Sequence, residues 1–280
     1  TDWYIDQVLL EDNLLIRALE NKGVKVSKKD WRDTSFNWNN TKYAIFRTTW
    51  DYFNKYNEFI SWINETKNKT NFINSTDVIL WNIDKHYLQD LKNNGINIAS
   101  SIFIEKGDDI TLEKLFKMTR WDEAVIKPTV SGAALNTYRI NENNFSNHEL
   151  LFKKLVKKES FIFQEFLQNI ISEGEISLIM IAGEYTHAVR KIAKKGDFRV
   201  QDDHGGKVEI YQANYNEIKF AKNCINQCPS LPAYARVDIV YDNKNQISLS
   251  ELELIEPELW FRNNPSSAAK LSEELIARAF

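Results

Sequence analysis

The spacing of hydrophobic residues along the chain alternates between helical and extended patterns. Apolar positions three and four residues apart predict helices at 11–22, 56–67, 84–95, 111–118, 150–158 and 216–226, and one from Pro265 onward. Alternating or continuous aliphatic residues predict strands at 24–26, 42–48, 96–104, 123–128, 138–140, 161–167, 175–182, 185–192, 234–240 and 247–253. Strands and helices alternate through most of the chain, which predicts a mixed α/β (α+β) fold.

The first part of this pattern predicts a separate domain. Helix, strand, strand and helix between residues 11 and 67 indicate a small α/β unit with a parallel sheet, and the polar segment 67–75 marks its end. The predicted units are therefore 1–75, 76–163 and 164–280. The sequence begins at Thr1 and enters a helical pattern almost at once. A strand preceding this sequence is thus one expectation.

The strongest chemical signal is a predicted hairpin of the strands 234–240 and 247–253. Its turn lies in the sequence DNKNQ, so residues whose numbers sum to 489 are expected to pair. Asp238 then lies opposite Glu251, and Arg236 lies opposite Glu253, with all four on one face. Facing carboxylates repel unless a cation such as Mg²⁺ binds them. Two interpretations stay open from these residues alone, a magnesium site and a solvent-facing edge hairpin.

Composition excludes several classes of protein. The 280 residues are 43% hydrophobic and 12% aromatic, which is typical of a globular protein. The formal charge of −3, with both signs interspersed, gives no argument for nucleic acid or a membrane surface as partner. Cys224 and Cys228 lack the partners of a zinc site, and no apolar run reaches membrane-spanning length. The expected location is the cytoplasm.

Three further stretches carry candidate binding residues. Lys127 ends a predicted strand beside the small-residue loop TVSGAALNT, an arrangement suited to phosphate, although it is not a Walker loop. Arg47, Trp50 and Asp51 lie at the end of the strand 42–48, where either a ligand or a structural Arg–Asp pair would fit. The polar segment 193–207 is either a mobile loop near a site or an ordinary exposed connection.

Taken in order, these landmarks resemble the ATP-grasp superfamily, with glutathione-synthetase-like and ribosomal-protein-modifying ligases nearest. The matching stretches are RTTWDYF, WNIDKHYLQDL, VIKPTVSGA, QEFL, GEISLIMIAGE, HAVRKIAKKGDFRVQDDHGG, YARVDIV and ELELIEP. The resemblance implies an ATP-grasp fold, in which an N-terminal α/β domain (1–75) precedes a central subdomain with a lid loop (76–163) and a C-terminal subdomain with the metal site (164–280).

The resemblance also implies roles for individual residues. The expected ATP-binding residues are Lys85, Lys127, Thr129, Ser131, Gly132, Gln164, Glu165, Phe166, Leu167 and Glu175. Those expected to act in catalysis are Arg236, Lys191 and Arg199, and those near the substrate are Arg47, Asp51 and His204. The expected metal ligands are Asp238, Glu251 and Glu253. Because the family often has Asn at the position of Glu253, Glu256 is an alternative third ligand.

The implied activity is that of an ATP- and Mg²⁺-dependent ligase. Such an enzyme activates a carboxylate as an acylphosphate for attack by an amine, and it requires no side-chain nucleophile, which agrees with the absence of a Ser–His–Asp motif. Two Mg²⁺ ions are expected, with Mn²⁺ as a substitute. Expected partners are ATP, an amino acid or peptide substrate, and a second copy of the chain in a homodimer. Two alternatives remain, a non-catalytic ATP-binding regulatory module and an ATP-grasp-type kinase.

Overall fold

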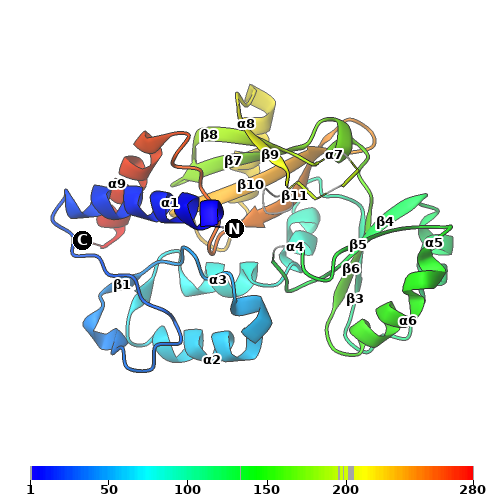
Figure 1. The fold of residues 1–280 in the computed structure, drawn as a ribbon, viewed down its shortest axis with the longest axis horizontal. Coiled ribbons are helices and arrows are strands. Elements are labelled where there is room, and N and C mark those ends of the chain that lie inside the picture. Colours follow the sequence, from blue (N-terminus) through cyan, green and yellow to red (C-terminus); the bar gives the residue numbers. More distant parts are fainter. Residues whose placement is uncertain (1, 133, 195, 198, 201–204, 280) are drawn as a thin grey trace.

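The computed structural model describes residues 2–132, 134–194, 196–197, 199–200 and 205–279. Three units are visible in Figure 1. The described helices are α1 (Asp2–Glu20), α2 (Tyr56–Thr66), α3 (Thr76–Asn82), α4 (Tyr87–Asn93), α5 (Leu112–Thr119), α6 (Phe145–Val156), α7 (Asn169–Ser172), α8 (Tyr215–Ile225) and α9 (Pro265–Ala279). The described strands are β1 (Tyr43–Ala44), β2 (Asn71–Phe72), β3 (Ser101–Ile104), β4 (Glu123–Pro128), β5 (Tyr138–Asn141), β6 (Phe161–Glu165), β7 (Glu175–Ile181), β8 (Glu184–Ile192), β9 (Lys207–Tyr211), β10 (Tyr234–Tyr241) and β11 (Ile247–Glu253).

The largest unit is an antiparallel sheet in the order β11-β10-β7-β8-β9. β7 and most of β10 are buried on both faces, which explains their near-continuous apolar sequences. On one face, Cys224 and Ile225 of α8 pack against Leu178 of the sheet. On the other face, α9 and α1 pack around Ile179 and Val189. Figure 1 shows these two helices side by side.

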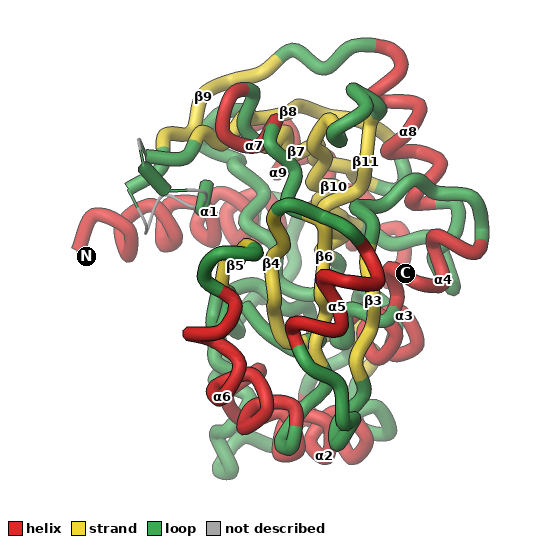
Figure 2. Tube along the Cα trace, turned by 90° about the vertical axis from the view of Figure 1, so that its right-hand side faces the viewer, coloured by secondary structure: helices red, strands yellow, loops and turns green. Residues whose placement is uncertain are grey.

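The second unit is an antiparallel sheet in the order β3-β6-β4-β5. Helices α5 and α6 cover one face, where Leu115 and Phe152 pack against Phe161 and Phe163 of β6. Figure 2 shows both helices in front of these strands. The opposite face of this sheet is thereby left to contribute to the site.

The N-terminal unit contains the short parallel pair β1-β2, with α2 against it. A parallel sheet is predicted here, but with a strand at 24–26; the observed partner of β1 is β2, in the segment 67–75 predicted to end the unit. Its core is an aromatic cluster in which Phe59 stacks on Tyr52 and Trp62. Two buried asparagines join the segments that follow this unit to the C-terminal sheet. Asn74 donates to the carbonyl oxygens of Tyr234 and Leu254, and Asn82 donates to that of Leu252. The end of β11 is thereby fixed.

Several element boundaries differ from the sequence prediction. The first helix begins at Asp2 instead of residue 11, and it packs on α9 instead of the N-terminal unit. The prediction of a strand at 24–26 is wrong, because Val24 and Val26 pack against the α1/α9 core without pairing in a sheet. β9 follows the polar segment and was not predicted. Asp84 accepts from the His86 backbone N–H, one turn before α4, but it does not cap that helix.

None of the described helices combines the length and apolar character that crossing a membrane requires.

Candidate active site

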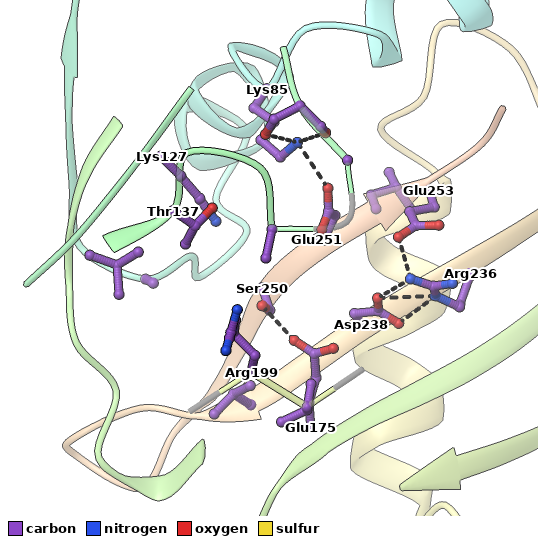
Figure 3. A pocket seen from close by; sticks show the side chains of 18 of the residues that line it. Lys85, Lys127, Thr137, Glu175, Arg199, Arg236, Asp238, Ser250, Glu251 and Glu253 are labelled. Carbon is purple, nitrogen blue, oxygen red and sulfur yellow. Dashed lines mark hydrogen bonds and ion pairs between the residues drawn. The ribbon is translucent and has the colours of Figure 1, made fainter. Parts of the chain in front are cut away.

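A cavity of about 360 Å³ lies where the three units meet. Its walls come from the N-terminal unit (Trp50, Tyr52, Phe53), from the four-stranded sheet and its loop, and from β7, β10, β11 and the segment after β11. Figure 3 shows lysines on one side of this cavity and the carboxylates of β10 and β11 on the other. The motifs that lie far apart in the sequence are therefore brought to one place.

The hairpin of β10 and β11 has the predicted pairs at the site but not beside the turn. Asp238 pairs with Glu251 and Arg236 pairs with Glu253, as predicted, whereas Ile239 pairs with Leu249 and Tyr241 with Ile247, one residue out of the predicted register. A bulge after Asp238 accounts for the difference. The Arg236 guanidinium donates to both carboxylate oxygens of Asp238, with Nε–O distances of 2.9 and 3.0 Å. It also forms an ion pair with Glu253. Burial would raise the pKa of Asp238, but the charges of Arg236 and Lys191 hold it at about 2.

Two lysines line one end of the cavity and give it the positive charge that suits phosphate binding. Lys85 Nζ lies 2.7 Å from the Ser131 carbonyl oxygen and 3.2 Å from Glu251. Lys127 projects from β4 toward the same space (Figure 3), and burial together with the Lys85 charge lowers its pKa. A bound polyanion would favour the charged form of Lys127 and so oppose this lowering of its pKa. The predicted pair of ATP lysines thus converges.

The loop after β4 makes a close approach to the N-terminal unit at Gly132. A Cβ atom built on Gly132 would lie 2.6 Å from Cε1 of Phe53, so no side chain fits without a shift. Gly132 and Phe53 both line the cavity. The glycine is therefore required for packing against the aromatic ring.

We expect Gly132→Ala to lower kcat/KM for ATP about tenfold, because overpacking costs about 1–3 kcal/mol. Steady-state kinetics with varied ATP would measure it. Removing the ring as well, in Gly132→Ala/Phe53→Ala, should recover most of the loss relative to Phe53→Ala alone. If the loss of kcat/KM in the double variant equals the combined losses of the two single variants, the steric explanation is contradicted.

The opposite end of the cavity is apolar. Ala99, Val125, Leu167, Ile170 and Val240 line it beside Gln164, Glu165 and Phe166. The Gln164 side chain donates to Ser101 Oγ at 3.0 Å, which fixes its amide, and Arg139 lies 3.9 Å from the centre of the Phe166 ring. Such an apolar slot with a positioned amide suits a planar base. Gln164, Glu165, Phe166 and Leu167, all among the expected ATP-binding residues, lie together here.

Glu175 lies between these two ends. It accepts from Ser250 Oγ at 2.8 Å and forms an ion pair with Lys191, which also lies 3.2 Å from Asp238. Lys191 is almost fully buried, and its ammonium group neutralises both of these carboxylates. The predicted catalytic role of Lys191 is therefore accompanied by a structural one.

The donor set for a divalent cation consists of carboxylate oxygens. Glu251 and Glu253 are each about one-third exposed, at 33% and 30%, and both line the cavity. Asp238 is 1% exposed, and its oxygens already accept from Arg236, Lys191 and Ser177. No group of three His, Cys, Asp or Glu side chains converges at metal-binding distance among the described residues. Glu251 and Glu253 thus fit Mg²⁺, with phosphate oxygens and waters to complete its shell.

Some predicted residues lie elsewhere. Arg47 donates to the Pro257 carbonyl oxygen, and Asp51 accepts from Trp31, so both contact the protein itself and neither lines the cavity. Thr129 is buried and does not line the cavity. Arg199 lines the cavity and pairs with Asp197. His204 lies outside the described residues.

Other cavity residues were not predicted. Tyr87 and Tyr52 line it, and so do Glu258 and Trp260 from the segment after β11. The stretch RTTWDYF was noted in the sequence, but of its aromatic residues only Trp50 was named as a candidate. Glu258 and Trp260 follow the metal-strand motif closely, yet an extended segment without periodicity gives no indication of where its side chains point.

Several acids near the site have raised pKa values. Burial raises the pKa of Glu253 to about 7, although Arg236 opposes this, and burial with the Glu253 charge raises that of Glu256 to about 8. Behind the cavity, burial raises the pKa of Glu11 from 4.5 to about 7 despite Arg47. The Glu11 carboxylate accepts from the Leu259 N–H, so this acid supports the segment after β11.

Glu11 predicts a pH dependence of stability. The folded protein binds its proton more tightly than the unfolded chain, so unfolding releases a proton between pH about 4.5 and about 7. The free energy of unfolding should therefore fall as pH rises through this window, by on the order of 2 kcal/mol from Glu11. Unfolding in guanidinium chloride at pH about 4.5 and about 7 gives this free energy at both ends of the window. Between them it should fall less in Glu11→Gln than in wild type. The exposed control Glu113→Gln should keep the wild-type slope, and an unchanged slope in Glu11→Gln would contradict the assignment.

Comparisons with known proteins agree with this geometry. Residues 2–74 match the family model of the D-cycloserine synthetase DcsG N-terminal domain, and residues 104–242 match that of the prokaryotic glutathione synthetase ATP-grasp domain. The cycloserine biosynthesis protein DcsG of Streptomyces lavendulae is 23% identical over 284 residues, covering 94% of this chain and 92% of that protein.

Solved structures share the fold. D-cycloserine synthetase DcsG superposes with a TM-score of 0.88 at 22% identity, over 96% of this chain and 94% of the other. D-alanine–D-alanine ligase from Bacillus anthracis in complex with ATP gives 0.66 at 13% identity, over 98% and 92%. The two family models cover residues 2–74 and 104–242, which include the cavity residues of β4, β7 and β10 but not those of β11 or the segment after it. This chain belongs to the ATP-grasp superfamily and is an ATP-dependent carboxylate–amine ligase.

Proposed function

We propose that this enzyme activates the carboxylate of a small molecule as an acylphosphate within the cavity and then transfers the acyl group to an amine. The observation that carries the proposal is the continuity of one cavity. It joins an apolar slot for a base, two lysines for a triphosphate, and an acidic face that contains a buried arginine. These are the parts that phosphoryl transfer requires, since it depends on positioning and charge neutralisation.

The chemistry divides between the residues as follows. A carboxylate oxygen of the substrate attacks the γ-phosphorus, the bond to the β–γ bridging oxygen breaks, and ADP leaves. The amine then attacks the carbonyl carbon, inorganic phosphate leaves, and the amine proton passes to solvent. Lys85 and Lys127 neutralise phosphate charge, while Arg236 stabilises charge on the transferring group and on the tetrahedral intermediate. When bound by Glu251 and Glu253, Mg²⁺ supplies Lewis-acid neutralisation of the triphosphate.

The wall of the same cavity bears on the class of substrate. The N-terminal unit supplies Trp50, Tyr52 and Phe53 to the wall, and this unit matches the D-cycloserine synthetase N-terminal model. We therefore infer a small-molecule ligase of the type of that relative.

The test uses hydroxylamine as a general acceptor. Purified protein with ATP, Mg²⁺ and a panel of small carboxylic acids should release ADP and form a hydroxamate, because hydroxylamine captures an acylphosphate. A stable phosphorylated product that hydroxylamine does not consume would indicate a kinase instead. Tight binding of ATP without ADP release for any acid would contradict the proposal.

A further inference from the structure

The connecting segment between β6 and α7, residues 165–168, lies between two cavities. Glu165 and Phe166 line the main cavity, and both also line a second, polar cavity together with Gln168 and Asn243. Because buried backbone N–H and C=O groups need partners, the hydrogen bonds of this segment determine where its backbone groups point. They therefore also determine which groups the main cavity offers to a ligand at this wall.

Asn243, in the turn between β10 and β11, binds one edge of the connecting segment. Its Nδ2 donates to the Phe166 carbonyl oxygen at 3.0 Å, and its Oδ1 accepts from the Gln168 N–H at 2.9 Å. Nδ2 also donates to Glu165 Oε1 at 3.0 Å. A carbonyl oxygen and the N–H two residues later lie on the same edge of an extended chain, where a neighbouring strand would bind them. One side-chain amide therefore takes the place of a strand at this edge.

The turn that carries Asn243 is itself held in place. Asp242 Oδ1 accepts from the Lys244 backbone N–H at 2.8 Å, and Asp242 Oδ2 accepts from Asn97 Nδ2 at 3.1 Å. Asn169, directly after the connecting segment, donates from its side chain to the Asp242 carbonyl oxygen at 2.9 Å. The Asn243 amide is thus presented to the segment from a braced turn, as a precise backbone contact requires.

The opposite edge of the connecting segment offers backbone groups to the main cavity. Successive residues of an extended chain direct their N–H and C=O groups to alternate edges, so those of Glu165 and Leu167 lie opposite those of Phe166. In the described part of the chain, neither the Glu165 carbonyl oxygen nor the Leu167 N–H has a hydrogen-bond partner, and both residues line the cavity. The pair forms one acceptor and one donor beside the apolar slot. The 6-amino group and N1 of adenine are the complementary donor and acceptor.

Resting on the function proposed above, we propose that Asn243 is a positioning residue for recognition of the nucleotide base. Its amide holds the outer edge of the connecting segment, which keeps the Glu165 carbonyl oxygen and the Leu167 N–H directed at the base. Asn243 does not line the main cavity, so it acts through this backbone alone. Selectivity for a 6-aminopurine therefore depends on a residue of the hairpin turn, outside the nucleotide site.

The test compares two nucleotides by isothermal titration calorimetry on the full chain with Mg²⁺, which requires no turnover. ATP carries the whole base, and purine riboside 5′-triphosphate lacks only the 6-amino group. We expect Asn243→Ala to raise the Kd for ATP about tenfold, because the hydrogen bonds that fix the segment are lost. The Kd for purine riboside triphosphate should rise less, so that the preference for ATP falls at least about threefold.

A second variant and a control from the same turn complete the test. Asn243→Asp keeps the acceptor for the Gln168 N–H, loses the donor to Phe166 and places a carboxylate beside that of Glu165, so it should weaken ATP binding at least as much as Asn243→Ala. Lys244→Ala, which removes an exposed side chain and keeps the backbone N–H, should match wild type. An unchanged Kd for ATP in both Asn243 variants, or an equal loss for both nucleotides, overturns the inference and leaves the ligase function intact. Wild-type protein that does not bind ATP overturns both.

Discussion

Arg236→Lys is expected to lower kcat about 1000-fold at saturating ATP, the scale of effect seen when a positioned arginine is removed from phosphoryl transfer. Arg236 is 9% exposed, and its planar group contacts Asp238 and Glu253 simultaneously. A lysine keeps the charge but cannot donate in this forked arrangement, so its ammonium would be drawn to one carboxylate. Hydroxamate formation under saturating conditions measures the change.

The matched control for this variant is Arg190→Lys. Arg190 lies on β8 with its guanidinium paired to Glu209, and it does not line the cavity. It should retain activity within about twofold of wild type. If Arg236→Lys remains within tenfold of wild type while folded, Arg236 acts structurally and the mechanism needs another group at the transferring phosphoryl.

Glu251→Gln is expected to raise the Mg²⁺ concentration for half-maximal activity at least about tenfold and to lower kcat about 100-fold. Burial would raise the pKa of Glu251, but the neighbouring Lys85 and Lys127 lower it, so the carboxylate is charged and faces the cavity. An amide keeps its shape and removes the charge that a divalent cation needs. Activity measured across a Mg²⁺ titration gives both quantities.

Asp238→Asn is the comparison that distinguishes a buried, ion-paired carboxylate from one that binds the metal ion. Asp238 is almost fully buried and satisfied by Arg236, Lys191 and Ser177, so its loss should reduce stability more than Mg²⁺ affinity. Thermal unfolding and the same Mg²⁺ titration distinguish the outcomes. A larger Mg²⁺ shift in Asp238→Asn than in Glu251→Gln would return Asp238 to the metal ligands.

The hairpin itself could be predicted because alternation along each strand and a short turn of Asp and Asn residues are local features. The register beside the turn differs by one residue from the prediction, and the Asp238–Glu251 and Arg236–Glu253 pairs form because a bulge follows Asp238. The hypothesis that the two lysines and residues 164–167 bind the nucleotide has a different basis. Their motifs occur in the same order as in the ATP-grasp superfamily, to which this chain belongs.

The contacts of these side chains could not be predicted in the same way. Strand alternation puts Asp238 on the face of Glu251 and Glu253, but it does not show that Lys191, 47 residues earlier, would neutralise it. Arg47 and Asp51 follow a strand, as ligands often do, yet Arg47 binds a backbone carbonyl 210 residues later. Such pairings depend on how three units dock, and no local pattern encodes that docking.

The sequence by itself determined the mixed α/β class, the existence of the hairpin and the ligase family, because periodicity, turn chemistry and motif order are properties of short stretches. The tertiary structure decided which carboxylates face the cavity, and it showed that Gly132 meets Phe53 and that, among the described residues, the Trp260 N–H has no hydrogen-bond partner. These features arise from burial and from contacts between segments far apart in the chain, where the energy of a charge or a polar group depends on everything packed around it.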